Sequence, residues 1–319
     1  MGNQRVKPLT EGGILAAISV VMALTSIYIP LLGTVIAFIW PLPIIILVVR
    51  HGLRWGILAS VVSGILIALL IHPLQAISMI IAFGLVGLVI GYNYRHGYGA
   101  FRSLFTAMGA SVISKIAVIA LGSIILNINP MNMQIDIMNE AFSTSMEIYR
   151  GSGMNETELA EMEKNFKAGL DTIRLLFPII IIMAGMLDAY INFIVAGRVL
   201  RRLGTLNIVT LKPFAEWRLS LWVVYLYAFS LIGMYWGPQL KNDLLFQVSL
   251  NANLFANLLG FVQGLTLLSF AADRYKIGKL VRIVGVFILI TNGFFLQVIS
   301  LTGLFDIIFD IRRRMAIRR

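Results

Sequence analysis

The chain has 319 residues, of which 59% are hydrophobic and only 13% are charged, and its mean hydropathy is +0.88. A soluble domain carries about 25% charged residues, so this composition excludes an ordinary soluble domain. It predicts an all-α protein that crosses a membrane several times as a polytopic helical bundle. The absence of cysteine excludes disulfides and thiolate metal sites, and the three histidines are too scattered for a metal site. We therefore expect no metal and no cofactor.

Long stretches without charged side chains locate the spans. Between Glu11 and Arg50 lie 38 uncharged residues, and one helix of that length would measure about 57 Å, nearly twice a ~30 Å hydrocarbon core. This stretch must fold back, and Pro30 is the natural end of its first helix. After Arg54 a similar stretch of 40 residues is interrupted only by His72-Pro73, which predicts a second hairpin. We expect about eight or nine spans, at 12–30, 33–49, 55–72, 74–92, 103–126, 173–197, 219–237 and 244–270, with a last apolar stretch from 283 to about 305.

Basic residues predict the orientation of the chain, because cytoplasmic loops carry an excess of Lys and Arg. They occur before the first span and in every second loop after it. This pattern places the amino terminus and these loops in the cytoplasm. It also explains the net charge of +11 without a nucleic-acid partner, for which a basic, aromatic groove would be needed.

The segment 127–172 is expected to be an external acidic loop. Residues 131–171 contain eight acidic and three basic residues, for a net charge of −5. After Gly151-Ser152-Gly153, apolar residues recur at helical spacing, which predicts an amphipathic helix that continues into the sixth span. Such a loop is either a lid over an external site or a solvated connector on the membrane surface.

The carboxyl end predicts an interrupted last segment. Nine complete spans would place five arginines of the final eight residues outside the cell, against the positive-inside rule. Asn292-Gly293 lies in the middle of the last apolar stretch. We expect a re-entrant or hairpin-like segment that returns the Arg-rich tail to the cytoplasm.

Two opposite charges inside predicted spans are the main candidates for a site. Lys115 lies in the middle of the fifth span, and Asp188, with Asn192 one turn later, lies in the sixth. Each charge costs several kcal/mol in hydrocarbon unless it is paired or hydrated. Their depths match, so an ion pair is plausible. It either lines a ligand or ion pathway or only orients the two helices.

Other polar residues near or inside the spans are weaker candidates. His72 and Gln75 lie at the external turn of the second hairpin and are interfacial turn residues or ligand contacts. Trp40-Pro41-Leu42-Pro43 breaks the second span and frees backbone carbonyls. Asn251, Asn253, Asn257 and Gln263 are expected to form hydrogen bonds between helices.

Several catalytic signatures are missing from the sequence. It has no GxxxxGK[ST] phosphate loop, no HExxH and no GxSxG. A second deep acid, which an intramembrane aspartyl protease would need, is also missing. We therefore expect no catalytic residues, no ATP hydrolysis by this chain and no enzyme activity.

Several segments together resemble the YybS-like family of bacterial membrane proteins. These segments are PLPIIILVVRHGLRWG at 41–56, AYINFIVAGRVLRRLG at 189–204, KPFAEWRL at 212–219, NLLGFVQGL at 257–265 and GLFDIIFDIRRR at 303–314. Their order and the closing FDIRRR carry the resemblance, which runs over nearly the whole chain.

Residues 10–200 are also similar to the membrane-embedded substrate-binding (S) components of energy-coupling factor transporters. That resemblance implies six helices with both ends cytoplasmic. It further implies a pocket towards the external side among spans 74–92, 103–126 and 173–197, and contact between small residues of the first helix and an energy-coupling transmembrane subunit. Ala17 and Ala23 stand in the corresponding stretch.

The predicted organisation is a six-helix membrane domain at 1–200 and a carboxyl-terminal membrane module of two or three helical segments at 201–319. The leading functional prediction is substrate capture for an importer energised by separate ATPase subunits, with an unknown small molecule as substrate. The alternative is a scaffold or regulator that assembles with envelope or cytoplasmic partners and does not transport. A polar cavity that opens outward would favour the first, and a dry core with every deep polar group paired would favour the second.

Overall fold

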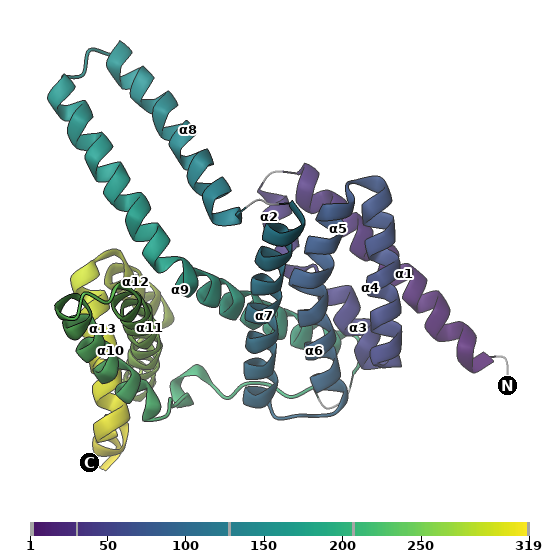
Figure 1. Cartoon of the computed structure of the whole chain (residues 1–319). Coiled ribbons are helices and arrows are strands. Elements are labelled where there is room, and N and C mark those ends of the chain that lie inside the picture. The colour runs from purple at the N-terminus through teal and green to yellow at the C-terminus, as the bar shows by residue number, and fades with distance from the viewer. Residues whose placement is uncertain (1–2, 30, 127–128, 206–207, 318–319) are drawn as a thin grey trace. The chain divides into compact units, whose positions relative to one another are not determined.

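In a computed structural model, which describes residues 3–29, 31–126, 129–205 and 208–317, the chain is helical and these residues form no strand (Figure 1). The prediction of an all-α protein is confirmed. Pro30, Arg318 and Arg319 lie outside the described residues. The elements are α1 (Asn3–Tyr28), α2 (Leu32–Ile39), α3 (Leu42–His51), α4 (Leu53–Leu70), α5 (Pro73–Met79), the π-helical turn η1 (Ile80–Gly84), α6 (Leu85–Arg95), α7 (Ala100–Leu126), α8 (Pro130–Gly151), α9 (Glu156–Arg202), the short 3-10 turn η2 (Phe214–Glu216), α10 (Trp222–Gln239), α11 (Asp243–Arg274), α12 (Lys279–Thr291), α13 (Gly293–Phe309) and α14 (Ile311–Ile317).

Among the described residues, seven helical segments are long and apolar enough to cross a membrane, or eight if the bent pair α12–α13 is counted as one span. The two predicted hairpins are present as α1 followed by α2–α3, and α4 followed by α5–η1–α6. The predicted span at 219–237 forms α10 but is not among the seven. Its many Tyr and Trp residues and its closing Pro-Gln explain this, because they are less apolar than aliphatic residues.

The chain divides into two compact units. Unit 1 comprises residues 1–167 and 180–210, and unit 2 comprises residues 168–179 and 211–319. The long helix α9 contributes to both units.

Unit 1 is built around α3, whose residues Ile44, Ile45, Leu47 and Val48 are at most 1% exposed. Helices α1, α4 and α6 pack against α3. Glycine permits close approach of both neighbours: a Cβ on Gly56 of α4 would lie 2.2 Å from Val48 Cγ2, and a Cβ on Gly91 of α6 would lie 2.6 Å from Val48 Cβ. Unit 1 therefore buries an almost purely aliphatic helix at its centre.

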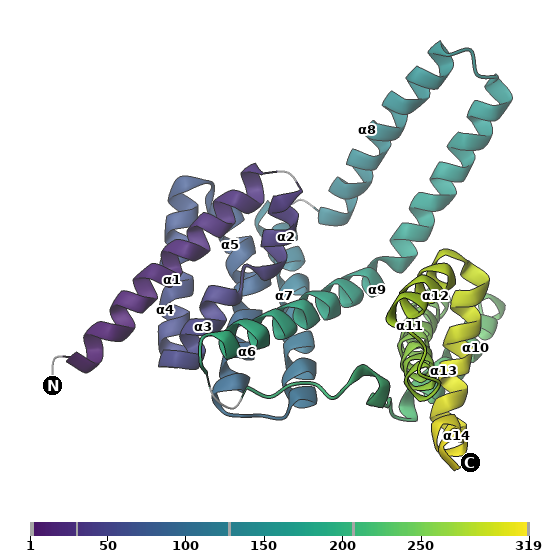
Figure 2. The same cartoon turned by 180° about the vertical axis from the view of Figure 1, so that it is seen from behind.

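The segment that the sequence predicts to be external is a helical hairpin. Residues 130–151 were predicted as loop, but they form α8, and the predicted amphipathic helix after Gly153 is the start of α9. Figure 2 shows α8 and this part of α9 lying side by side. Phe142 and Phe166 stack across the hairpin with ring centroids 3.9 Å apart. The sequence did not predict α8, because the side of α8 that faces α9 becomes buried only when α9 folds back against it.

In unit 2, α11 and α13 run parallel. Ser300 Oγ donates to the carbonyl of Asn257 at 2.8 Å, and six residues later Asp306 Oδ2 accepts from Gln263 Nε2 at 2.7 Å. Residue numbers therefore rise together along both helices. A Cβ on Gly303 would lie 1.9 Å from the carbonyl oxygen of Gly260, so glycine is required for this approach.

The last apolar stretch is interrupted where the sequence predicts. Asn292 separates α12 from α13, and the two helices differ in direction by 109°. Because α13 is parallel to α11, it ends at the same end of unit 2 as Arg274. Helix α14 and the basic loop 274–282 therefore share one side of unit 2, which is the relation the charge pattern predicts.

Candidate functional site

The carboxylate of Asp188 is the centre of a buried polar cluster in unit 1. Its Oδ2 accepts from Lys115 Nζ at 2.8 Å and from Ser111 Oγ at 2.7 Å, and Lys115 also donates to Ser111 Oγ at 2.9 Å. Asp188 and Ser111 are at most 1% exposed. A Cβ on Gly185 would lie 3.0 Å from the backbone nitrogen of Val112, so a glycine one turn before Asp188 lets α9 approach α7 this closely.

The depths of the two charges match, as the sequence predicts. Lys115 is 15 residues from the first residue of α7, and Asp188 is 14 residues from the last residue of α9. These separations correspond to about 22 and 21 Å along the helices. The two charges therefore lie at the same depth, and Lys115 lies near the middle of α7, which is 27 residues long.

Asn192 connects the cluster to the break in the second span. Its Nδ2 donates to Asp188 Oδ1 at 2.9 Å and to the carbonyl of Phe38 at 2.8 Å. Phe38 lies in the last turn of α2, where carbonyls have no partner inside the helix. The break at Trp40 and Pro41 therefore supplies a carbonyl that Asn192 uses.

Lys115 is the most exposed member of the cluster, although it is only partly exposed. Its side chain is 20% exposed, whereas that of Asp188 is 1% exposed. The ammonium lies 5.6 Å from the ring centroid of Phe83, within cation–π range. Phe83 belongs to the π-helical turn η1, a departure from α-helical geometry that is frequent at functional sites.

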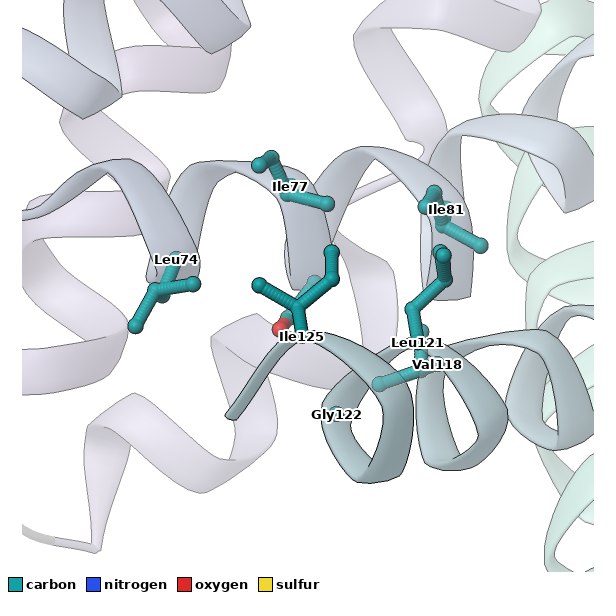
Figure 3. A pocket seen from close by; sticks show the side chains of 8 residues that line it. Leu74, Ile77, Ile81, Val118, Leu121, Gly122 and Ile125 are labelled. Carbon is teal, nitrogen blue, oxygen red and sulfur yellow. The ribbon is translucent and has the colours of Figure 1, made fainter. Parts of the chain in front are cut away.

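A small apolar cavity lies on the same face of α7. Val118 and Gly122, three and seven residues after Lys115, line it together with residues of α5 and η1 (Figure 3). Its volume is about 40 Å³. That volume holds a few water molecules at most, whereas pockets for drug-sized ligands measure about 300–1,000 Å³.

His72 and Gln75 are not part of the charged cluster. His72 caps α5, where its Nδ1 accepts from the backbone nitrogen of Leu74 at 3.3 Å. Both side chains are exposed, and in the described part of the chain neither makes a hydrogen bond to Lys115 or Asp188. They lie next to Leu74 at the end of the cavity nearest the hairpin turn.

The two alanines proposed for a partner helix differ in exposure. Ala17 is exposed on α1. Ala23 is fully buried in a core cluster with Val20, Trp40 and Ile44. The contact with a partner helix expected for Ala23 is therefore replaced by packing inside unit 1, because the broken second span folds onto that side of α1.

The polar residues of α11 form hydrogen bonds between helices, as predicted. Asn251 Nδ2 donates to the carbonyl of Leu175 at 2.8 Å, and Asn253 Nδ2 donates to Ser230 Oγ at 3.1 Å. Asn257 accepts from Ser300. These contacts join α11 to three other helical segments of unit 2.

Unit 2 contains a second charged pair that the sequence reasoning missed. Arg312 Nε lies 3.0 Å from Asp306 Oδ2, and both side chains are 3% exposed. Arg312 also donates to the carbonyl of Ala215 at 2.6 Å and to Thr266 Oγ1. Burial lowers the pKa of the Arg312 guanidinium, and the adjacent Asp306 carboxylate opposes this. Asp306 Oδ1 is buried and has no hydrogen-bond partner among the described residues.

The signal for this second pair was present in the sequence. Three of the segments that carry the family resemblance, 212–219, 257–265 and 303–314, meet at this pair. The distances between these segments along the chain did not predict that they come into contact. The described residues contain no group of three or more His, Cys, Asp or Glu side chains that could hold a metal ion.

The helices and the buried polar clusters define a multi-pass helical membrane protein. The chain belongs to the family of predicted membrane proteins designated DUF2232, whose profile matches residues 17–307. It is also 26% identical to the uncharacterized protein YybS of Bacillus subtilis (strain 168), over 98% of this chain and 99% of that protein. No solved structure matches the chain. The resemblance to the YybS-like family is confirmed, and the similarity to S components stays a prediction.

Proposed function

We propose that this chain captures a small-molecule substrate for an importer whose ATPase subunits are separate proteins. One observation carries the proposal: Lys115 and Asp188 form a mid-depth ion pair whose lysine is partly exposed and lies on the same helix face as a cavity. Charges at this depth are costly and mark substrate or ion pathways in many membrane proteins. Capture itself requires no catalytic residue in this chain.

The position of the cavity supports the proposal. It lies between the fourth and fifth spans, two of the three spans that the similarity to S components implicates. A ligand of vitamin size needs far more than the cavity's volume of about 40 Å³. Capture therefore requires the ends of α5 and α7 near His72 to separate and to widen the apolar groove towards Lys115.

We further propose that the protein resides in the bacterial cell membrane with its amino terminus and Arg-rich tail in the cytoplasm. The positive-inside rule supports this orientation. It places the hairpin of α8 and α9 outside, near the end of the cavity at which a substrate would enter. Ala17, exposed on α1, is the proposed contact for an energy-coupling transmembrane subunit.

A second candidate function is a scaffold or regulator that does not transport. It is favoured by the completeness of the hydrogen bonding around Asp188, whose two carboxylate oxygens both have donors. Such a pair stabilises the helix packing without a ligand. The small volume of the cavity also favours the scaffold or regulator.

Affinity purification from the native membrane at endogenous level distinguishes the two functions. If the chain is an importer component, an energy-coupling membrane subunit should be recovered together with its ATPases. The variant Ala17→Trp should lose them, whereas the matched variant Leu69→Trp, at a 77% exposed position on α4, should retain them. Reproducible recovery of envelope or signalling proteins without ATPases would reject the importer and favour the scaffold.

A ligand screen by thermal unfolding tests the site itself. Compounds that stabilise the wild-type chain should not stabilise the double variant Lys115→Leu/Asp188→Leu, in which both charges are replaced together so that no unpaired charge is buried. Stabilisation that persists in the double variant would place the ligand elsewhere.

A further inference from the structure

The carboxyl-terminal end of unit 2 combines exposed arginines with exposed aromatic rings. Phe305 and Phe309 are 51% and 48% exposed and stack with ring centroids 6.1 Å apart. The guanidinium carbon of Arg314 lies 5.8 Å from the ring centroid of Phe309. An apolar surface thus ends directly at a positive charge.

The fold fixes which arginines face outward. Asp310, in a left-handed conformation with φ 43°, ends α13 and turns the chain into α14. Arg312 then points into unit 2, where it pairs with Asp306. Arg313 and Arg314, the next two residues, are exposed, and among the described residues neither forms an ion pair. The buried Arg312 therefore anchors α14 and orients its two neighbours.

The position of these arginines relative to the membrane follows from α11 and α13. Both helices end at the same end of unit 2, so Arg313 and Arg314 lie at the end where α11 leaves the hydrocarbon region. The exposed rings of Phe309 and Phe305 precede Arg313 by about one and two helical turns, on the side of the hydrocarbon region. This is the order in which a phospholipid presents its phosphate and its acyl chains.

We propose that the junction of α13 and α14 binds an anionic phospholipid, with its phosphate at Arg313 and Arg314 and its acyl chains against Phe305 and Phe309. Charge complementarity and continuity with the exposed face of α13 identify the occupant as a lipid rather than a soluble anion. A free phosphate would gain nothing from the aromatic pair. This proposal is independent of the proposed transport function.

The test uses the full chain purified in a neutral detergent and titrated with short-chain phosphatidylglycerol, with the thermal unfolding midpoint as readout. Phosphatidylglycerol should raise the midpoint, and phosphatidylcholine of the same chain length should not. The variant R313Q/R314Q should require about 30-fold more phosphatidylglycerol for the same shift, since each basic residue near an anionic surface contributes about fivefold. Phe309→Ala should weaken the same response.

The matched control is K276Q/K279Q, which removes two exposed positive charges from the basic loop at the same end of unit 2. It should respond to phosphatidylglycerol as the wild type does. An equal loss in both double variants would show a diffuse charge effect and overturn the site. An equal shift with inorganic phosphate, or with phosphatidylcholine, would also overturn it.

Discussion

Asn192 Nδ2 donates a hydrogen bond of 2.8 Å to the carbonyl of Phe38, a residue 154 positions earlier in the chain. The same amide group contacts Asp188 Oδ1. One side chain thus joins the broken second span to the charged pair. The polar cluster is therefore a candidate site that also contributes to the packing of unit 1.

Removing Lys115 alone should destabilise the protein more than removing both charges. In Lys115→Leu, Asp188 keeps a buried charge without its partner, and such a loss costs about 3–5 kcal/mol. Adding Asp188→Asn should restore much of the folded yield. Fluorescence-detected size-exclusion chromatography of detergent extracts measures that yield. If Asp188→Asn did not relieve the defect of Lys115→Leu, the ion pair would not be the cause.

Asn192→Ala should lower the unfolding free energy by about 1–3 kcal/mol, because the carbonyl of Phe38 and Asp188 Oδ1 lose a buried donor. Asn165→Ala is the control, since Asn165 is exposed on the same helix; its effect should stay within about 0.5 kcal/mol. Thermal unfolding of both variants in the same detergent gives the comparison. Equal effects would show that the contact with Phe38 does not matter for stability.

Gly303→Ala should disrupt the pairing of α11 and α13. The added Cβ would lie 1.9 Å from the carbonyl oxygen of Gly260 and 2.5 Å from the nitrogen of Gly264, and both are backbone atoms. Overpacking costs about 1–3 kcal/mol or more, and here no side chain can move aside.

Gly285→Ala in α12 is the matched control, because nothing lies within 4 Å of its Cβ. At this position alanine should leave the unfolding free energy unchanged or raise it by up to about 1 kcal/mol, because alanine favours the helix more than glycine does. Comparing the unfolding midpoints of both variants tests whether the close packing at Gly303 requires glycine. A wild-type midpoint for Gly303→Ala would contradict the close parallel packing.

The absence of cysteine makes topology measurable with single introduced thiols. In intact cells, a membrane-impermeant maleimide should label Ser152→Cys at the tip of the hairpin of α8 and α9, which the proposed orientation puts outside. It should label Lys279→Cys and Arg313→Cys only after permeabilisation. Labelling of Arg313→Cys but not Lys279→Cys from outside would contradict the parallel arrangement of α11 and α13. The reverse pattern at all three positions would invert the orientation and leave that arrangement intact.

Charge and apolar length alone predicted much of this architecture. The charge-free stretches located the two opening hairpins, the proline pair located the break after α2, and Asn292-Gly293 located the break before α13. These features are local, because the absence of charge and the break that a proline or an Asn-Gly pair introduces each depend on the residues of one segment. The matching depths of Lys115 and Asp188 also followed from counting residues along two antiparallel spans.

Only the tertiary structure decided what the polar residues contact. The amide of Asn192 reaches Phe38, and Arg312 reaches Asp306 and the carbonyl of Ala215, because helices distant in sequence pack there. Likewise α8 is a helix whose apolar side packs on α9, and Ala23 is buried because α3 and the break after α2 cover it. The sequence by itself determined which segments are helical and apolar enough to cross a membrane, since those properties depend on each segment alone. The partners of each buried group depend on which helix faces come together, and the spacing along one chain does not record this.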